Sequence, residues 1–362
     1  MEQCIGHNPI FSIIPPHILH AIAHNAEPEQ RQKALQTLSY DSTIRTLRAT
    51  HSLFSDTQAK ARAWLRMDQE VHRVIYDAHG TTNLPGTIVR VEGSGPSPDP
   101  AVNEAYDGLG WTHAFYSQVY GRNSIDDEGM PLDAVVHFGA NYINAFFNGE
   151  YMVFGDGDNE FFNRFTISLD VIGHELTHGV TEHEAGLDYL GQPGALNESI
   201  SDVFGSLIKQ FSLKQRTDEA DWLIGQGLFT GRVQGRALRS MSAPGTAFDD
   251  PILGKDPQPA HMSNYVYTVR DHGGVHINSG IPNLAFYKVA TKLGGKAWEH
   301  AGRIWYETLR DQRLSRTANF QAFARLTLNN AEILYGRDSR DWSAVQEAWD
   351  EVGVLRVEAL VL

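Results

Sequence analysis

One five-residue segment, His174-Glu175-Leu176-Thr177-His178, constrains the fold of this chain more than any other part of the sequence. On a helix, residues four positions apart lie on one face, so both imidazoles can bind a single metal ion. Glu175 then lies about 100° around the helix axis, where its carboxylate reaches a metal-bound water without binding the metal. Apolar residues at helical spacing from Leu169 to Val180 predict that helix. The alternative is a pair of core or surface histidines, because the motif on its own also arises by chance.

The third metal ligand is expected farther along the chain. One known arrangement places a glycine and a third histidine directly after the motif, but Thr181 and Glu184 occupy those positions. Another arrangement uses a carboxylate on the next helix, and Glu198 follows His178 by 20 positions. Asp202 shares a helix face with Glu198, so it can accept the second N–H of a ligand histidine and fix its tautomer. Two histidines, one glutamate and an open position describe a catalytic zinc site, and an ordinary acidic helix face is the alternative.

The order of the predicted elements gives the fold class. At 362 residues the chain exceeds one comfortable hydrophobic core, so two lobes and an extension are expected. A region rich in β-type runs precedes a mainly helical region, which predicts an α+β protein with a cleft between its β-rich and helical lobes. Strands are expected at residues 73–77, 87–91, 134–138 and 151–154, and helices at 102–120, 168–182, 197–211, 281–293, 296–309, 319–334 and 342–352.

Residues 1–55, called the leader below, read as a separate unit. An apolar patch runs into Pro15-Pro16-His17-Ile18-Leu19, residues 27–38 favour a helix, and residues 43–63 suit an exposed linker. The Pro15-Pro16 pair is stiff and lacks normal amide hydrogens, so it can occupy a cleft and resist cleavage. We expect the leader to inhibit the enzyme, which then cuts itself between about residues 45 and 60. Cys4 acting as a zinc-binding thiolate is the alternative, although a free cysteine is more often structural.

Composition excludes several classes of partner. Lys plus Arg is 30 and Asp plus Glu is 44, so the net charge is −14, which disfavours nucleic acid and anionic membrane surfaces. A single cysteine excludes an intrachain disulfide. The first 19 residues lack the basic and continuous apolar regions of a secretory signal, and no run approaches the ~18 apolar residues of a membrane span.

Three blocks of this sequence resemble the thermolysin family. They are the His174–His178 motif, Asn197-Glu198-Ser199-Ile200-Ser201-Asp202, and Asp271-His272-Gly273-Gly274-Val275-His276-Ile277-Asn278-Ser279-Gly280. The resemblance extends from about Val71 to the C-terminus and implies a two-lobed thermolysin-like fold with a central zinc-binding helix. The leader, with its Pro-Pro motif ending in Leu19, is similar to the short propeptides of the protealysin branch.

The resemblance implies roles for residues that match the family's motifs. His276 would donate a hydrogen bond to the oxyanion, Asp271 would orient it, and Tyr189 would be the second oxyanion-stabilising group. His276 also falls in a glycine-rich loop where backbone can approach a substrate, whereas a lone histidine is usually structural. The resemblance also implies that Arg239 binds a substrate carbonyl, with a buried ion pair as the alternative. Asn144 and Ala145 would form the edge that pairs with an extended substrate. Asn197 would contact the zinc ligands from outside the ligand set.

Two further expectations follow from the same resemblance. Phe162, Val171 and Leu238 match the lining of the subsite for the residue after the scissile bond, which predicts cleavage before Leu, Ile, Phe or Val. Ordinary core positions are the alternative for all three.

A double calcium site is expected to be absent, although calcium binding elsewhere stays open. Asp170 and Asp221 fit such a site, but Lys209, Leu223 and Gln226 stand where carboxylates are expected. The Lys209 ammonium can replace the cation electrostatically. The segment 156–160 resembles the start of an EF-hand loop but lacks that loop's sixth-place glycine and twelfth-place glutamate, which predicts a turn.

Together these features predict a secreted-type neutral zinc metalloendopeptidase with one zinc ion, made as a self-processed zymogen. The predicted units are the leader at 1–55, an N-terminal catalytic lobe at 65–183 and a C-terminal lobe at 184–362. Protein and peptide substrates and its own leader are the expected partners of a monomer. Secretion by a route without a signal peptide is expected, with a cytoplasmic location as the alternative. The rival functions are a zinc aminopeptidase, whose acidic amine-binding motif is missing before the zinc helix, and a catalytically silent binding protein.

Overall fold

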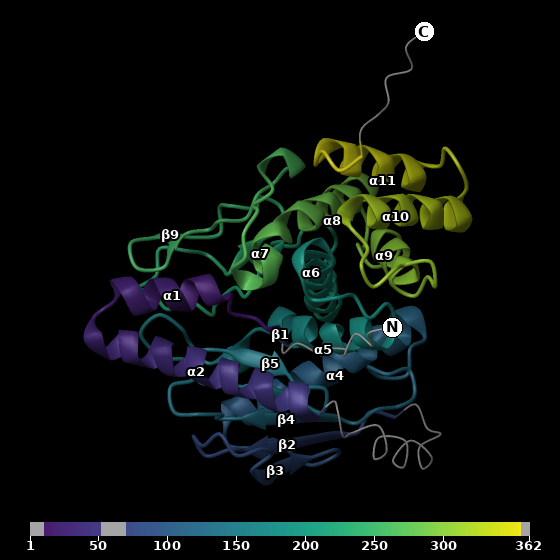
Figure 1. Cartoon of the computed structure of the whole chain (residues 1–362). Coiled ribbons are helices and arrows are strands. Elements are labelled where there is room, and N and C mark those ends of the chain that lie inside the picture. Colours follow the sequence, from purple (N-terminus) through teal and green to yellow (C-terminus); the bar gives the residue numbers. More distant parts are fainter. Residues whose placement is uncertain (1–10, 52–69, 356–362) are drawn as a thin grey trace, which may run out of the picture.

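The computed structural model describes residues 11–51 and 70–355. The leader comes first, followed by a lobe built on a β-sheet and a lobe of helices, with α5 and α6 between them (Figure 1). The helices are α1 Pro16–Asn25, α2 Pro28–His51, α4 Pro100–Tyr120, α5 Leu169–His183, α6 Gly191–Leu213, α7 Asp271–Asn278, α8 Gly280–Leu293, α9 Ala301–Leu309, α10 Phe320–Tyr335 and α11 Arg340–Glu351. The strands are β1 Phe11–Ser12, β2 Arg73–Asp77, β3 Thr87–Val91, β4 Leu132–Val136, β5 Ala145–Phe147, β6 Tyr151–Phe154, β7 Leu223–Ile224, β8 Arg239–Ser240, β9 Asp249–Asp250 and β10 Gly254–Lys255.

The main sheet has six strands in the order β1-β5-β6-β4-β2-β3. Strands β6, β4 and β2 run parallel at its centre, and β3 and β5 are antiparallel to their neighbours. Four of the five residues of β4 are buried, whereas β3 is largely exposed at one edge. The leader supplies β1, which pairs antiparallel with β5 at the opposite edge.

Helices α5 and α6 pack at very close range because glycine lies on both sides of their contact. A methyl group on Gly205 would collide with the Asp170 carbonyl oxygen, and one on Gly173 would come within 2.7 Å of Ile208 Cδ1. Only residues without a Cβ permit this approach. The contact brings the histidine face of α5 against the acidic residues of α6.

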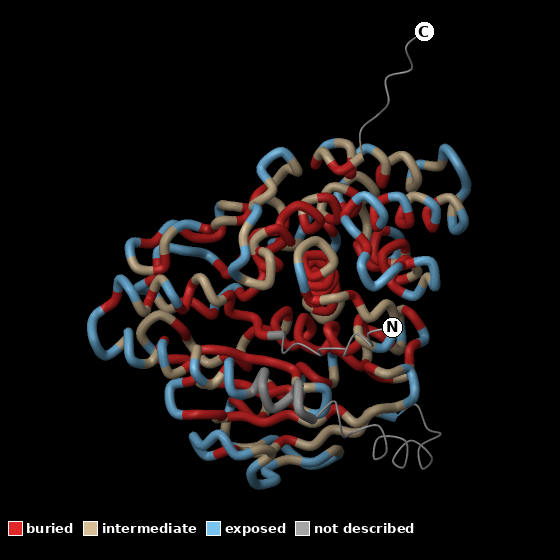
Figure 2. The backbone as a smooth tube through the Cα atoms, in the orientation of Figure 1, coloured by how far each residue is buried: buried red, intermediate tan, exposed pale blue. Residues whose placement is uncertain are grey.

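The helical lobe encloses its own part of the core. Trp305 and Trp349 stack with ring centroids 6.0 Å apart, and Phe323 packs edge-on against both. Figure 2 shows that α6 is buried along most of its length, while the outer turns of both lobes are exposed. Among the described residues, no helix is both long and apolar enough to cross a membrane.

Most predicted elements are present, and the strands at 73–77, 87–91 and 151–154 match to the residue. Four boundaries are wrong. Strand β4 ends at Val136 because His137 adopts a left-handed φ of 54°. Helix α6 begins at Gly191, since proline is tolerated in a first helical turn. Helix α9 begins at Ala301, because residues 297–300 form a separate turn. Residues 43–51 continue α2 rather than forming a linker, and residues 52–63 lie outside the described part.

Candidate metal centre and substrate cleft

The three predicted metal ligands meet in the interior between α5 and α6. His174 Nε2 lies 3.0 Å from His178 Nε2, and Glu198 carboxylate oxygens lie 3.5 and 3.6 Å from the two nitrogens. Ligands of a tetrahedral zinc ion bonded at about 2.0–2.1 Å are separated by about 3.3 Å, so these spacings fit one ion. Glu198 Oε2 is buried without a hydrogen bond from any described residue. The donor set therefore suits zinc, and these residues form the one metal-binding group among the described residues.

A second row of side chains orients the two imidazoles. His174 Nδ1 lies 2.8 Å from Asp202 Oδ1, and His178 Nδ1 lies 2.8 Å from Asn197 Oδ1. When each Nδ1 donates its proton to these oxygens, the Nε2 lone pairs face the metal position. Asp202 also accepts hydrogen bonds from Arg239, and the positive charge of Arg239 helps to lower the pKa of Asp202 to about 2 despite burial.

Glu175 lies beside the metal group and is fully buried. Its Oε2 accepts a hydrogen bond of 3.2 Å from the Phe147 N–H of β5, and its Oε1 has no hydrogen-bond partner among the described residues. Burial raises the pKa of Glu175 well above its usual range, and the nearby His174 opposes that shift only in part. A carboxyl group with a raised pKa is suited to exchanging protons near neutral pH.

The opposite wall of the site is formed by α7 and Tyr189. His276 Nδ1 lies 2.6 Å from Asp271 Oδ1, and Tyr189 donates a hydrogen bond to Glu198 and lies 3.3 Å from His276 Nε2. Burial lowers the pKa of His276, but Asp271 and Glu198 outweigh burial and raise it overall. A hydrogen-bonded carboxylate thus keeps the His276 ring oriented with Nε2 toward the cleft.

The backbone of α7 differs from the expected loop. Residues 271–274 all have φ between 49° and 85°, so they form a left-handed turn, and His276 follows in a right-handed turn. Left-handed backbone is costly for Asp271 and His272, which carry a Cβ, and free for the two glycines after them. The turn aims the Asp271 carboxylate back at His276, whose backbone N–H it also binds at 3.0 Å.

The leader strand occupies the cleft along β5. Ile13 N–H donates to the Ala145 carbonyl oxygen at 3.2 Å, and Ile14 N–H donates to Asn144 Oδ1 at 2.9 Å. Arg239 donates to the Ile13 carbonyl oxygen at 3.2 Å. His276 Nε2 lies 3.2 Å from the Ser12 carbonyl oxygen. The three residues predicted to bind a substrate backbone, Asn144, Ala145 and Arg239, therefore contact the leader backbone, and so does His276.

Three residues, 13–15, separate helix α1 from the end of this strand. Pro15 precedes α1, Pro16 is its first residue, and Leu19 is fully buried. The proline pair therefore starts a helix, and the leader residues with contacts to His276, Arg239 and Asn144 come before it. Burial lowers the pKa of His17 to about 4, against the opposing effect of Asp271, so its ring is neutral at neutral pH.

Helix α2 provides a second contact with the same edge of the cleft. Buried Asp41 accepts hydrogen bonds from the Tyr142 hydroxyl at 2.5 Å and from Asn144 Nδ2 at 3.1 Å. Buried Thr37 accepts the Ile143 N–H at 3.1 Å. Sequence reasoning missed Thr37 and Asp41, whose only signal is an i, i+4 spacing on a polar helix. It also missed Ser12 and Ile13, which are ordinary residues of an apolar patch.

The three predicted subsite residues are buried, with exposures of 0% for Phe162 and Val171 and 2% for Leu238. They belong to the same apolar core cluster as Ile13 and Ile14 of the leader. Burial alone fits a core position as well as a pocket wall. Membership of the main core cluster, which extends through both lobes, does not distinguish these two interpretations.

The Lys209 ammonium lies between the two aspartates that matched a calcium site in the sequence. Lys209 Nζ lies 2.7 Å from Asp170 Oδ2 and 2.9 Å from Asp221 Oδ1, and it also donates to the Leu223 carbonyl oxygen at 2.9 Å. Burial lowers the pKa of Lys209, but Asp170 and Asp221 outweigh burial and raise it overall. Segment 156–160 is a turn, as predicted, in which Asp158 accepts three successive backbone N–H groups.

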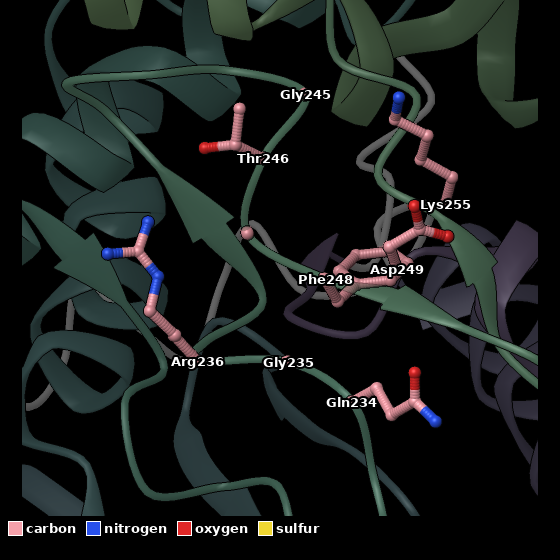
Figure 3. Close-up of a pocket in the computed structure, with 9 residues that line it drawn as sticks. Gln234, Gly235, Arg236, Gly245, Thr246, Phe248, Asp249 and Lys255 are labelled. Atoms are coloured by element: carbon pink, nitrogen blue, oxygen red, sulfur yellow. The ribbon is translucent and has the colours of Figure 1, made fainter.

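A surface pocket of about 460 Å³ lies elsewhere, lined by residues 234–236, 245–249 and Lys255. The side chains of Arg236 and Lys255 extend on opposite sides of this pocket and do not converge (Figure 3). None of the residues of the metal group lines it, and we assign it no function.

Known families match nearly the whole chain. The thermolysin metallopeptidase catalytic domain matches residues 41–182, and the alpha-helical domain of the same metallopeptidases matches residues 185–354. The protealysin propeptide matches residues 11–40.

Individual proteins and structures agree with these matches. An extracellular metalloprotease of Pectobacterium carotovorum subsp. carotovorum is 52% identical over 96% of this chain and 97% of its own length. Thermolysin of Alicyclobacillus acidocaldarius subsp. acidocaldarius is 37% identical over 77% of this chain and 50% of its own length. The solved precursor of protealysin, a metalloproteinase from Serratia proteamaculans, is 54% identical, covers 95% of this chain and 100% of its own, and gives a TM-score of 0.86.

Proposed function

We propose, from the premise that this chain belongs to the thermolysin family of zinc metallopeptidases, that it is a latent endopeptidase which cuts before bulky apolar residues. The observation that carries the proposal is the buried group of His174, His178 and Glu198 with Glu175 beside it. When bound there, zinc supplies a Lewis acid that polarises a substrate carbonyl and lowers the pKa of water.

The side chains around that group divide the remaining work. Glu175 takes the proton of the attacking water and passes it to the departing amine, which its raised pKa favours. His276, oriented by Asp271, and Tyr189 donate hydrogen bonds to the oxygen on which negative charge develops. Asn144 and Ala145 hold the substrate strand.

Specificity follows from the apolar core around the cleft. A side chain after the scissile bond enters a pocket lined by Phe162, Val171 and Leu238, which are buried and apolar, as is Ile13 of the leader. A buried apolar pocket rejects charged groups because they lose their hydration there. Cleavage before Leu, Ile, Phe or Val is therefore proposed.

Latency comes from the leader, placed at residues 1–55, ahead of catalytic lobes at 65–183 and 184–362. The contacts of Ser12, Ile13 and Ile14 fill the positions of a substrate backbone, which supports inhibition by the leader. Activation by a cut between about residues 45 and 60 falls at the end of α2 and in residues outside the described part. Cys4 also lies outside it.

Three finer features are proposed with this function. The enzyme acts as a monomer and is exported, which the extracellular naming of the Pectobacterium relative supports. It does without the double calcium site, because Lys209 places an ammonium between Asp170 and Asp221.

The first test compares wild type with Glu175→Ala after incubation with zinc. The wild type should lose about 50 residues and the variant none, measured by intact mass and N-terminal sequencing. Hydrolysis of N-blocked peptides by the wild type should accompany this, because an aminopeptidase leaves blocked peptides intact. An unprocessed wild type that is also inactive on blocked peptides would contradict the proposal.

The leader's second contact gives a further prediction. Asp41→Asn removes a buried charged acceptor from Tyr142 and Asn144, so the leader should dock about tenfold more weakly and the precursor should process itself faster. Glu29→Gln is the matched control, since Glu29 lies on the same helix with a side chain that is 73% exposed. Equal processing rates for both variants would show that the hydrogen bonds of Asp41 to Tyr142 and Asn144, called the Asp41 clamp below, do not hold the leader in place.

A further inference from the structure

The leader pairs antiparallel with the edge strand β5, and one of its peptide bonds lies beside the candidate catalytic residue His276. On one side of the Ser12–Ile13 bond, the Ser12 carbonyl oxygen is 3.2 Å from His276 Nε2. On the other side, the Ile13 N–H binds the Ala145 carbonyl oxygen and the Ile13 carbonyl oxygen binds Arg239. These contacts define which leader bond stands in the place of the scissile bond.

The two residues after that bond fit the same register. Ile13 is apolar and fully buried, so the residue that follows the bond belongs to the class that the proposed specificity requires. Ile14 N–H binds Asn144 Oδ1 one residue farther along. The stiff Pro15-Pro16 pair lies beyond this point and does not protect the Ser12–Ile13 bond.

We propose that the enzyme hydrolyses its own leader between Ser12 and Ile13, at a second processing site distinct from the activating cut near residues 45–60. Water adds to the Ser12 carbonyl carbon, the bond to the Ile13 nitrogen breaks, and a carboxylate on Ser12 and an ammonium on Ile13 result. Glu175 carries the proton between water and amine, and no oxidant or reductant is needed. This inference rests on the proposed endopeptidase function.

The cut leaves the inhibitor in place. After cleavage, the leader from Ile13 onward keeps the Arg239 and Asn144 contacts, the packing of α1, and the Asp41 clamp. The precursor clipped at Ser12–Ile13 is therefore still latent. Release of activity depends on the separate cut after α2.

The test follows zinc-loaded full-length precursors by intact mass and peptide mapping. Wild type should yield a peptide ending at Ser12 and a chain beginning at Ile13, whereas Glu175→Ala should yield neither. Ile13→Asp places a charge in the apolar pocket and should slow this cut at least about tenfold. His20→Asp is the matched control, because His20 is exposed on helix α1 of the leader. This variant should be cut at the same rate as wild type.

Two further measurements keep the inference separate from the proposed function. The rate constant should stay the same over an about tenfold dilution, because the bond lies within the same molecule's cleft, and a rate proportional to concentration would overturn the inference. Amide hydrogen exchange of the Glu175→Ala precursor should show protected Ile13 and Ile14 N–H groups, and unprotected amides would also overturn it. Wild type that hydrolyses N-blocked peptides but never yields a terminus at Ile13 refutes this cut alone. Wild type that does neither refutes both proposals.

Discussion

Helices α5 and α6 carry two buried clusters of acidic groups that balance their charge in different ways. In one, Glu198 faces the Nε2 atoms of His174 and His178, which offer lone pairs and a place for a metal. In the other, Asp170 faces the ammonium of Lys209 at 2.7 Å. The two clusters lie on the same helix pair and differ in the residues opposite the carboxylate.

The energetic logic is the same in both clusters. A carboxylate removed from water is costly unless an opposite charge and hydrogen bonds replace its hydration. Lysine provides that charge permanently as part of the chain. The histidine cluster leaves an open position, and an open position is what chemistry at a metal requires. Changes to the two clusters should therefore differ in kind and in size.

The largest effect is expected from removing a ligand in the histidine cluster. Glu198→Ala should reduce bound zinc from about one ion per chain to about none and abolish turnover, because two imidazoles alone hold zinc weakly. Elemental analysis and a blocked-peptide assay measure the two outcomes. Full zinc content in this variant would place the metal elsewhere.

The lysine cluster should respond in stability rather than in activity. Lys209→Met removes the ammonium and leaves Asp170 buried, which should lower the free energy of unfolding by about 3 kcal/mol. Calcium should then raise the melting temperature of the variant but not that of the wild type, because the two aspartates regain a cation. Lys255→Met, at an exposed lysine, is the control. A calcium response in the wild type would contradict the proposed absence of the double site.

An intermediate effect is expected at Asp202, which contacts both a metal-ligand histidine and a positively charged side chain. Asp202 accepts hydrogen bonds from both His174 and Arg239, so it combines a metal-supporting contact with an ion pair. Asp202→Asn should weaken zinc binding about 10–100-fold, because it no longer fixes the His174 tautomer with a charged acceptor. A competitive chelator titration measures the change. If zinc affinity were unaltered, the role of Asp202 would be confined to its ion pair with Arg239.

The histidine cluster could be predicted from the sequence, and much of the leader's interface could not. The spacing of His174 and His178 encodes their shared position, because helix geometry places residues four apart on one face, and Glu198 was identified from a known arrangement with a carboxylate on the next helix. No comparable periodicity connects Asp41 with Tyr142 or Ser12 with His276, which are about 100 and more than 260 positions apart. The resemblance supplied Asn144 and Arg239, and the register of Ser12 on them came from the structure alone.

Boundaries failed where one residue's backbone overrode a favourable pattern. Strand β4 was expected to continue to residue 138, but the left-handed conformation of His137 ends it at Val136. That conformation places the His137 ring between Asp99 and Asp156, at 2.7 and 2.9 Å. His137 thus forms a third cluster, in which the charge of two carboxylates is balanced by an imidazolium that can lose its proton.

The smallest effect concerns this third cluster and its dependence on pH. Hydrogen bonding to Asp156, opposed by burial, raises the pKa of His137 to about 9 from an ordinary value of 6.5. The stabilisation is therefore fully present below pH 6.5 and is lost as pH rises through about 9. Because both carboxylates are partly exposed, about 1 kcal/mol is expected. His137→Asn keeps a residue that tolerates left-handed backbone but removes the charge. Chemical unfolding at pH 7 and pH 10 should show a decline in the wild type that the variant lacks. Equal declines would mean that the imidazolium, unlike the Lys209 ammonium, contributes no net stability to its carboxylate pair.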